Sequence, residues 1–185
     1  KIVEDLNKNK GVYLCSSFEY PGRYTRWDMG FINPPLEIRT FGRRIKISAL
    51  NQKGEVLLDY IFRNLSQADY FDDLELEREE NQITGRISPS SEVFPEEQRS
   101  RQKSVFSMVR SMMEAFHSED DHFLGLYGSF GYDLIFQFED IAMKRPRDED
   151  QADMALFIPD EIFVIDHQRG ETFLAKYEFE YNGRT

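Results

Sequence analysis

The segment 16–28, SSFEYPGRYTRWD, concentrates side chains that can bind a small polar-aromatic molecule. It holds two serines, two arginines and the only tryptophan of the chain, Trp27, around a Pro-Gly turn. Serine hydroxyls donate and accept hydrogen bonds, and a guanidinium can grip a carboxylate or stack on a ring. The alternative is that the aromatic residues pack this loop on a sheet while its arginines pair with Glu19 and Asp28.

Other reactive side chains do not form a recognisable catalytic or metal-binding pattern. His117 and His122 lack the i, i+4 spacing of a zinc pair, His167 is remote in sequence, and no cysteine joins them, so no metal site is predicted. The single cysteine, Cys15, lies in an apolar run that predicts a strand and an inert, buried thiol. The glycines of 125–131 do not fit a dinucleotide-binding spacing and indicate close packing. No catalytic residue is assigned.

The composition limits the classes of protein to which this chain can belong. With 185 residues, 40% of them hydrophobic and 14% aromatic, the chain is typical of a globular domain that needs no disulfide or metal. A net charge of −11 argues against a nucleic-acid partner. No apolar run approaches the ~18 residues of a membrane span, so no membrane partner is expected. One cysteine and no visible secretory signal favour a cytoplasmic protein.

Hydrophobic periodicity predicts few helices. A short amphipathic helix is expected within 1–10, a second helix over 55–65, and a short one over 134–139. The clearest helix spans 104–117, because its apolar residues form one stripe at helical spacing and Ser104 can cap its first turn.

Strand signals are more numerous than helix signals. The alternation of apolar and polar residues over 44–50 predicts a half-buried antiparallel strand. The other expectations are a strand at 11–17, a turn at 51–54, an acidic loop with a short strand at 69–80, an exposed connection at 88–102, a buried strand at 125–133, and two strands around a turn at 167–170, the second alternating from Phe173 to Tyr181. Because strands and helices do not alternate, the predicted fold class is α+β with a mainly antiparallel sheet.

Three segments carry a family resemblance: VYLCSSFEYPGRYTRWD at 12–28, GLYGSFGYDLIFQFE at 125–139 and DMALFIPDEIFVID at 153–166. They resemble the N-terminal region of anthranilate synthase component I, especially the fused type in which the synthase and the glutaminase share one chain. The resemblance implies the N-terminal part of that fold. It also implies that residues 1–185 form a regulatory, tryptophan-binding region, and that the chorismate-binding and glutaminase domains are absent from this chain.

The reaction of that family is a lyase reaction, the first step of tryptophan biosynthesis. Chorismate and glutamine give anthranilate, pyruvate and glutamate. The resemblance places the catalytic site and its Mg²⁺ in the later, catalytic domain, so this chain alone is expected to be inactive and to hold no cofactor. The implied partners are the catalytic domain, the glutaminase domain and tryptophan as feedback inhibitor.

The resemblance also implies which residues bind tryptophan. The family motif pairs an acidic residue with a serine at the end of the first strand. Here Ser17 takes the serine position, and Ser16 stands where the acid is usual. A basic residue further along the segment faces the same site; Arg26 matches it best, with Arg23 as the alternative.

Three other functions compete with this interpretation: the corresponding region of aminodeoxychorismate synthase, a free-standing amino-acid-binding module, and a structural half-domain that docks an apolar sheet face on a catalytic half. The apolar residues of 125–139 and 173–181 exceed what one helical stripe can cover. Self-association of the chain into a homo-oligomer is therefore expected.

Overall fold

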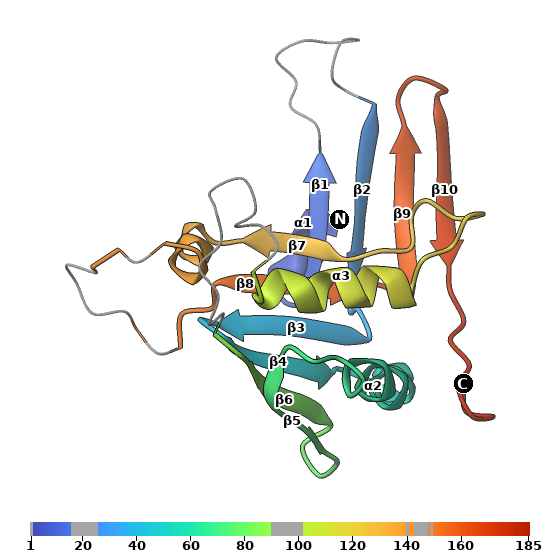
Figure 1. Ribbon diagram of the computed structural model, residues 1–185. Coiled ribbons are helices and arrows are strands. Elements are labelled where there is room, and N and C mark those ends of the chain that lie inside the picture. The colour runs from blue at the N-terminus through green and yellow to red at the C-terminus, as the bar shows by residue number, and fades with distance from the viewer. Residues whose placement is uncertain (1, 16–25, 90–101, 140, 143–147, 149) are drawn as a thin grey trace.

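Two antiparallel sheets and a few helices make up the fold, as the computed structural model shows (Figure 1). It describes residues 2–15, 26–89, 102–139, 141–142, 148 and 150–185. The architecture is α+β with antiparallel pairing in every strand pair, which confirms the predicted fold class.

The smaller sheet has four strands in the order β1 (Gly11–Cys15), β2 (Trp27–Ile32), β9 (Glu161–Asp166) and β10 (Glu171–Lys176). The larger sheet has six, in the order β5 (Phe71–Glu77), β6 (Gln82–Ile87), β4 (Arg44–Ala49), β3 (Leu36–Phe41), β8 (Met154–Ile158) and β7 (Tyr127–Phe130). In Figure 1 the strands of the smaller sheet run crosswise to those of the larger one.

The two sheets are joined by two neighbouring corners. β2 passes into β3 through Asn33–Pro35, and β8 passes into β9 through Pro159 and Asp160. Asn33 has a φ of 53°, a left-handed conformation that asparagine tolerates better than most residues. The prolines supply no backbone N–H, so the ladder hydrogen bonds end where the chain bends. Strands that switch sheets at such bends are the usual way of making crossed sheets.

The same two chain segments stay paired on both sides of the corners. β2 pairs with β9 before the corner, with Gly30 opposite Phe163, and β3 pairs with β8 after it, with Leu36 opposite Ile158. The corner is therefore a bent two-stranded ribbon, and its four strands occupy the inner positions of both sheets.

The main core lies between the six-stranded sheet and two helices, α2 (Gln52–Leu65) and α3 (Val105–Ala115). Alternate residues of β3, β4, β6 and β8 point into it, so Ile38, Ile47 and Ile83 are fully buried. A smaller cluster around Phe31 and Val164 lies on the four-stranded sheet. The remaining elements are a short helix α1 (Ile2–Leu6) and a 3₁₀ helix, η2 (Tyr132–Gln137). No helix of the described residues is long and apolar enough to cross a bilayer.

A half-buried arginine at the tip of the β3–β4 hairpin, Arg43, connects three other segments of the chain by hydrogen bonds. The guanidinium of Arg43 donates to the carbonyl of Ser88 at 2.9 Å, that of Lys103 at 2.8 Å and that of Gln137 at 3.2 Å. The Gln137 side chain in turn accepts the N–H of Val105 at 3.0 Å. The start of α3, the end of η2 and the end of β6 are thus fixed around one hairpin turn.

Several predicted elements are confirmed. The helices expected within 1–10, over 55–65 and over 104–117 appear as α1, α2 and α3, and Ser104 is the N-cap of α3. The strand at 44–50 and the hairpin around 167–170 are β4 and β9–β10. The expected connection at 88–102 lies almost wholly outside the described residues.

Other predictions were wrong. Residues 51–54 are not a turn: Asn51 caps α2, whose first turn they form. The segment 69–80 is mostly a seven-residue strand, β5, whose carboxylates alternate with half-buried leucines. The strand expected at 125–133 is four residues long and lies at a sheet edge, so three of its residues are exposed rather than buried. The alternating strand from Phe173 ends at Lys176. The Cys15 thiol is exposed, because β1 is also an edge strand.

Exposed apolar side chains bear on the expected self-association. Large hydrophobic residues such as Phe130, Tyr132 and Leu174 are at least half exposed, at 54%, 86% and 50%. They lie on different elements, an edge strand, η2 and β10, and the oligomeric state of the chain stays a prediction.

The start of α2 packs tightly against the first corner. A Cβ atom at Gly54, in the first helical turn, would lie 2.1 Å from the carbonyl oxygen of Pro35, closer than any side chain can approach. The neighbouring contacts hold this arrangement, since Leu50 N–H donates to the same oxygen at 2.8 Å and Asn51 Oδ1 accepts from Gly54 N–H at 3.1 Å.

Gly54→Ala should therefore destabilise the chain, although alanine favours a helix over glycine by about 1 kcal/mol. Because the clash is with a backbone oxygen, we expect the upper part of the overpacking range, about 2–3 kcal/mol, and hence a net loss of about 1–2 kcal/mol. Urea unfolding measures it. Gln52→Ala, at an exposed position of the same turn, is the control and should stay within about 0.5 kcal/mol. A Gly54→Ala chain as stable as the original would contradict the close contact.

Candidate functional site

Arg26 and Trp27, which belong to the segment singled out in the sequence, lie at one end of the four-stranded sheet. Cys15 ends β1 opposite Asp28 of β2, so the segment between them leaves and re-enters the sheet at adjacent strands. Ser16, Ser17 and Arg23 lie outside the described residues, and their roles stay predictions. Arg26 is described: it directly precedes β2, and its carbonyl accepts the N–H of His167 at 2.8 Å.

Arg26 stands beside an aromatic ring and a buried carboxylate. Its guanidinium lies over the Trp27 ring, 4.4 Å from the ring centroid, and Nη2 is 3.6 Å from Oδ2 of Asp166. About half of the Arg26 side chain, 47%, remains exposed. The guanidinium is thus held in place on one side while part of its hydrogen-bonding edge is open to a ligand.

The alternative interpretation of this segment is partly right. Trp27 does pack on the sheet, with its ring 5.7 Å from that of Phe123 in an edge-to-face arrangement. However, Asp28 does not pair with Arg26. Its Oδ2 lies 3.0 Å from Nε2 of His167 and 3.5 Å from the hydroxyl of Tyr13. Burial, followed by the charge of Asp28, raises the pKa of Tyr13 above its ordinary value.

Asp166 is the central charge of this end of the sheet, and sequence reasoning missed it. It is 1% exposed, and its Oδ1 accepts the backbone N–H groups of Gln168 at 2.9 Å and Arg169 at 3.1 Å. Its Oδ2 has no hydrogen-bond partner among the described residues, although guanidinium nitrogens of Arg26 and Arg169 lie 3.6 and 4.0 Å away. The turn that follows, ending at Gly170 with a φ of 67°, is the signal that could have identified it.

The ionisation of Asp166 is set by opposing influences. Burial, the largest, favours the neutral acid. The two backbone N–H donors and the guanidinium groups of Arg26 and Arg169 favour the carboxylate and outweigh burial, so the pKa of Asp166 is lowered from 3.8. At neutral pH a buried, anionic carboxylate therefore stands beside a half-exposed cation, and the exposed part of the Arg26 guanidinium can bind the carboxylate of an amino acid.

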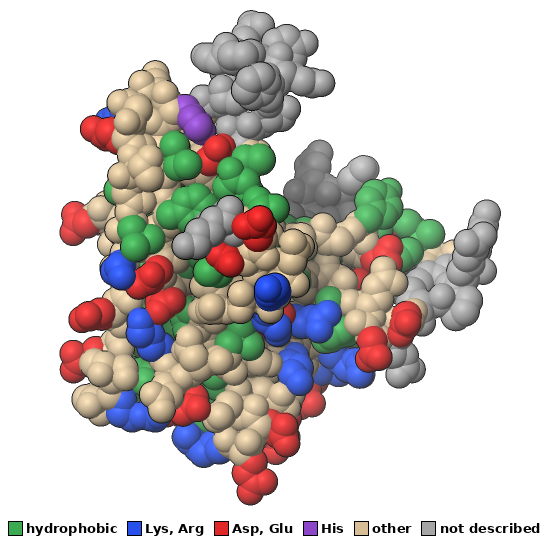
Figure 2. Space-filling view, turned by 180° about the vertical axis from the view of Figure 1, so that it is seen from behind, with side chains coloured by type: hydrophobic (Ala, Val, Ile, Leu, Met, Phe, Trp, Pro, Cys, Tyr) green, Lys and Arg blue, Asp and Glu red, His purple; other side chains and the backbone are tan. Residues whose placement is uncertain are grey.

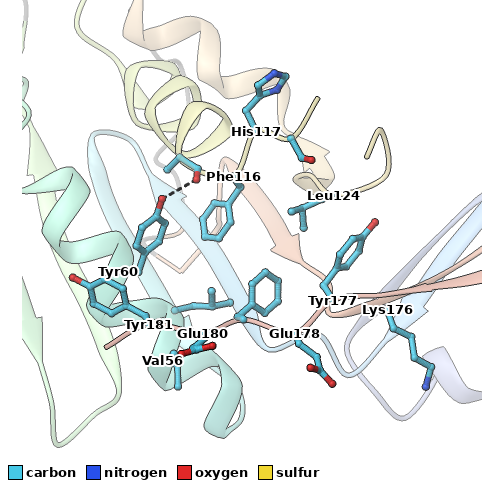
Figure 3. A pocket seen from close by; sticks show the side chains of 14 residues that line it. Val56, Tyr60, Phe116, His117, Leu124, Lys176, Tyr177, Glu178, Glu180 and Tyr181 are labelled. Atoms are coloured by element: carbon cyan, nitrogen blue, oxygen red, sulfur yellow. Dashed lines mark hydrogen bonds between the residues drawn. The ribbon is translucent and has the colours of Figure 1, made fainter. Parts of the chain in front are cut away.

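A hollow lies at the opposite end of the same sheet (Figure 3). It has a volume of about 510 Å³ and is lined by α2, the end of α3 and the segment that follows β10. Aromatic rings form its wall: Tyr60 contacts Phe116 at 5.6 Å and Tyr181 at 5.5 Å between centroids, and Phe116 contacts Phe179 at 6.2 Å. The Tyr60 hydroxyl donates to the carbonyl of Ala115 at 2.8 Å.

The two places are separate sites. β10 begins at Glu171, opposite Asp166, and ends at Lys176, which lines the hollow. The five steps along the extended strand from Glu171 to Lys176 span about 17 Å, so one small molecule cannot contact both ends. Charged groups stand around the hollow, including Lys176, Glu178 and Glu180. Among the described residues no group of three or more His, Cys, Asp or Glu is placed to hold a metal ion.

Comparison with curated proteins finds relatives named anthranilate synthase. The chain is 39% identical over 178 residues to an Azospirillum brasilense protein of that name, a match covering 96% of this chain and 24% of the relative. It is 26% identical over 169 residues to anthranilate synthase component 1 of Vibrio cholerae, covering 90% of this chain and 31% of that protein. A component 1 from Serratia marcescens is 27% identical over 166 residues, covering 87% of this chain and 30% of that protein. No family model matches.

The chain therefore spans only 24 to 31% of the length of these relatives, and the matches fall in their N-terminal part.

The charge of Asp166 should make the chain acid-sensitive. Because the pKa of Asp166 is lowered on folding, its stabilising contribution is full above the unfolded value of 3.8 and is lost as the pH falls below it. Asp166→Asn should therefore lower stability at neutral pH, and its difference from the original chain should shrink between about pH 5 and about pH 3. Urea unfolding at several pH values tests this.

Asp150→Asn, at an exposed position, is the matched control and should follow the original chain at every pH. A stability difference for Asp166→Asn that does not change with pH would show that the carboxylate charge is not the stabilising feature.

Proposed function

Because this chain is homologous to the N-terminal part of anthranilate synthases, we propose that it is the regulatory region of such an enzyme and helps bind tryptophan as feedback inhibitor. The observation that carries the proposal is the match over 96% of the chain. Under this proposal chorismate is converted in a catalytic domain beyond this chain, with Mg²⁺ and with glutamine nitrogen from a glutaminase domain. The 185 residues alone leave chorismate unchanged.

The tryptophan site of this proposal is the end of the sheet where β1, β2 and β9 meet. Ser17, two residues after the end of β1, and Ser16 supply hydroxyl groups. Arg26 supplies a cation that is half exposed and already held on the Trp27 ring and near Asp166. An amino acid carries a carboxylate, which the exposed part of this guanidinium can bind, while the buried Asp166 holds the guanidinium in place. Arg23 is the alternative cation.

Feedback inhibition provides the direct test. In an anthranilate synthase that begins with this chain, Ser17→Arg should raise the tryptophan concentration for half-inhibition at least about ten-fold, or about 1.4 kcal/mol of coupling. The larger cationic side chain fills the site and repels the ammonium of tryptophan. The rate without tryptophan should stay near that of the original enzyme, because effector binding and chorismate conversion occupy different sites.

Anthranilate fluorescence against tryptophan concentration gives the inhibition curve, and Ser17→Thr, which keeps the hydroxyl, is the control. An unchanged curve for Ser17→Arg would refute the role of Ser17. The aminodeoxychorismate synthase alternative predicts an enzyme that releases no anthranilate, so the same assay separates the two enzymes.

The aromatic hollow favours a second candidate, a free-standing amino-acid-binding module. A volume of about 510 Å³ falls within the range of small-molecule sites, and rings with charged groups around them suit an aromatic amino acid. This candidate needs no catalytic domain and places the ligand at the Lys176 end of β10, remote from Arg26.

Calorimetric titration of the chain with tryptophan distinguishes the two places. If tryptophan binds at the β1–β2 end, Arg26→Ala should weaken binding about ten-fold or more while Phe179→Ala leaves it unchanged. If the chain is instead a free-standing module that binds tryptophan in the aromatic hollow, Phe179→Ala should weaken binding and Arg26→Ala should leave it unchanged. Thermal unfolding of both variants checks that each is folded, and equal losses in both folded variants would contradict a single site at either end.

A further inference from the structure

The outer face of the six-stranded sheet carries four basic side chains close together. In β4, Ile45 and Ile47 point into the core, so Arg44 and Lys46 point outward and are exposed. Arg39 of β3 and Arg86 of β6 share that outer face, because their strands flank β4. In Figure 2, Lys and Arg side chains gather on the lower part of the molecule, where Figure 1 places these strands.

These cations stand in two like-charge pairs across neighbouring strands. The register places Arg39 directly opposite Lys46, and Arg44 directly opposite Arg86. Opposite residues on one face have Cβ atoms about 5 Å apart, and like charges in that position destabilise a sheet. Acidic residues are abundant in this chain, whose net charge is −11, yet cations occupy both positions of each pair.

The carboxylates near these pairs do not neutralise them. No salt bridge between described residues reaches any of the four cations. Asp73 of the edge strand β5 is opposite Arg86 on its other side but is not within ion-pair distance. Glu77, further along β5, is occupied by hydrogen bonds from Thr84 at 2.6 Å and Gln82 at 2.6 Å, and these, with the more distant charge of Lys46, lower its pKa.

A shallow groove of about 390 Å³ runs over the same face. Its lining includes Phe41, the three cations Arg44, Lys46 and Arg86, and one carboxylate, that of Asp73. The guanidinium of Arg39 lies 5.4 Å from the centroid of the Phe41 ring, so the groove offers an aromatic surface next to its cations. A cation without an ion-pair partner is stabilised when an anionic group of a binding partner contacts it. The aromatic ring offers the same partner an apolar contact.

We propose that this face is a docking surface for an acidic segment of a partner protein. Residues two apart on one face of an extended strand are about 7 Å apart, which is the spacing of Arg44 and Lys46. An extended segment with acidic residues at alternate positions repeats its carboxylates at the same distance. The segment would place carboxylates between the two like-charge pairs and remove the repulsion within each.

Two other anionic partners fit less well. Nucleic acid requires a broad basic surface, whereas the cations here line a single groove that also contains the carboxylate of Asp73. A free phosphate needs an enclosed cradle of donors, whereas Arg44, Lys46 and Arg86 are exposed on two strands around an open groove.

Binding of a labelled ten-residue polyglutamate peptide to the 185-residue chain tests the proposal by fluorescence anisotropy at low ionic strength. The variant is Lys46→Glu with Arg86→Glu, which places opposite charges across from Arg39 and Arg44. This variant should bind the peptide at least about ten-fold more weakly, and thermal unfolding checks that it is still folded. Binding to the original chain should weaken as salt is added.

The matched control is Lys53→Glu with Lys176→Glu, which changes the net charge equally at positions remote from the groove. It should bind the peptide within about two-fold of the original chain. An equal loss in the control would mean that only net charge matters and would overturn the proposal. So would displacement of the peptide by inorganic phosphate at the same concentration, or tighter binding of a labelled ten-nucleotide oligothymidylate.

Discussion

At Asn33–Pro35 and at Pro159–Asp160 the chain leaves one sheet and enters the other, and the two segments stay paired as they bend. This bent ribbon determines where the other elements lie. It makes β2 and β9 the inner strands of the smaller sheet and places β3 and β8 side by side in the larger one. It also sets the position of α2, whose first turn rests on the Pro35 carbonyl with no room for a side chain at Gly54.

The corners also separate the charged features of the molecule. Before them, the ribbon runs to the sheet end where Arg26, Asp166 and His167 meet, a small and partly buried cluster of opposite charges. After them, the larger sheet turns its outer face to solvent with cations that have no such partners. Charge at the first place is largely satisfied within the chain, whereas charge at the second place is not. We therefore propose a small carboxylate-bearing ligand for the first place and a macromolecular anion for the second.

The sequence predicted local elements better than their positions. The helix at 104–117 and the strand at 44–50 have strong periodicity, and both appear. Residues 51–54 misled because Asn, Lys and Gly suit a turn and a helix cap alike. The many carboxylates of 69–80 concealed an edge strand, whose outer side needs no apolar residue. Only part of the site could be predicted from the sequence. Arg26 was identified, but its neighbour Asp166 lies on β9, which pairs with β2 although the two strands are far apart in the sequence. No local pattern specifies such a contact.

The pairing of distant segments has a kinetic consequence. β3 emerges from the ribosome long before β8, its neighbour in the larger sheet, and β2 long before β9. Until residues 154–166 are made, the apolar edges of β2 and β3 have no partner strand, and closing so long a loop is slow. Strand edges that are unpaired during synthesis are prone to aggregation. The chain should therefore fold late, after its last hairpin is complete, and depend on chaperones more than a helical protein of equal length would.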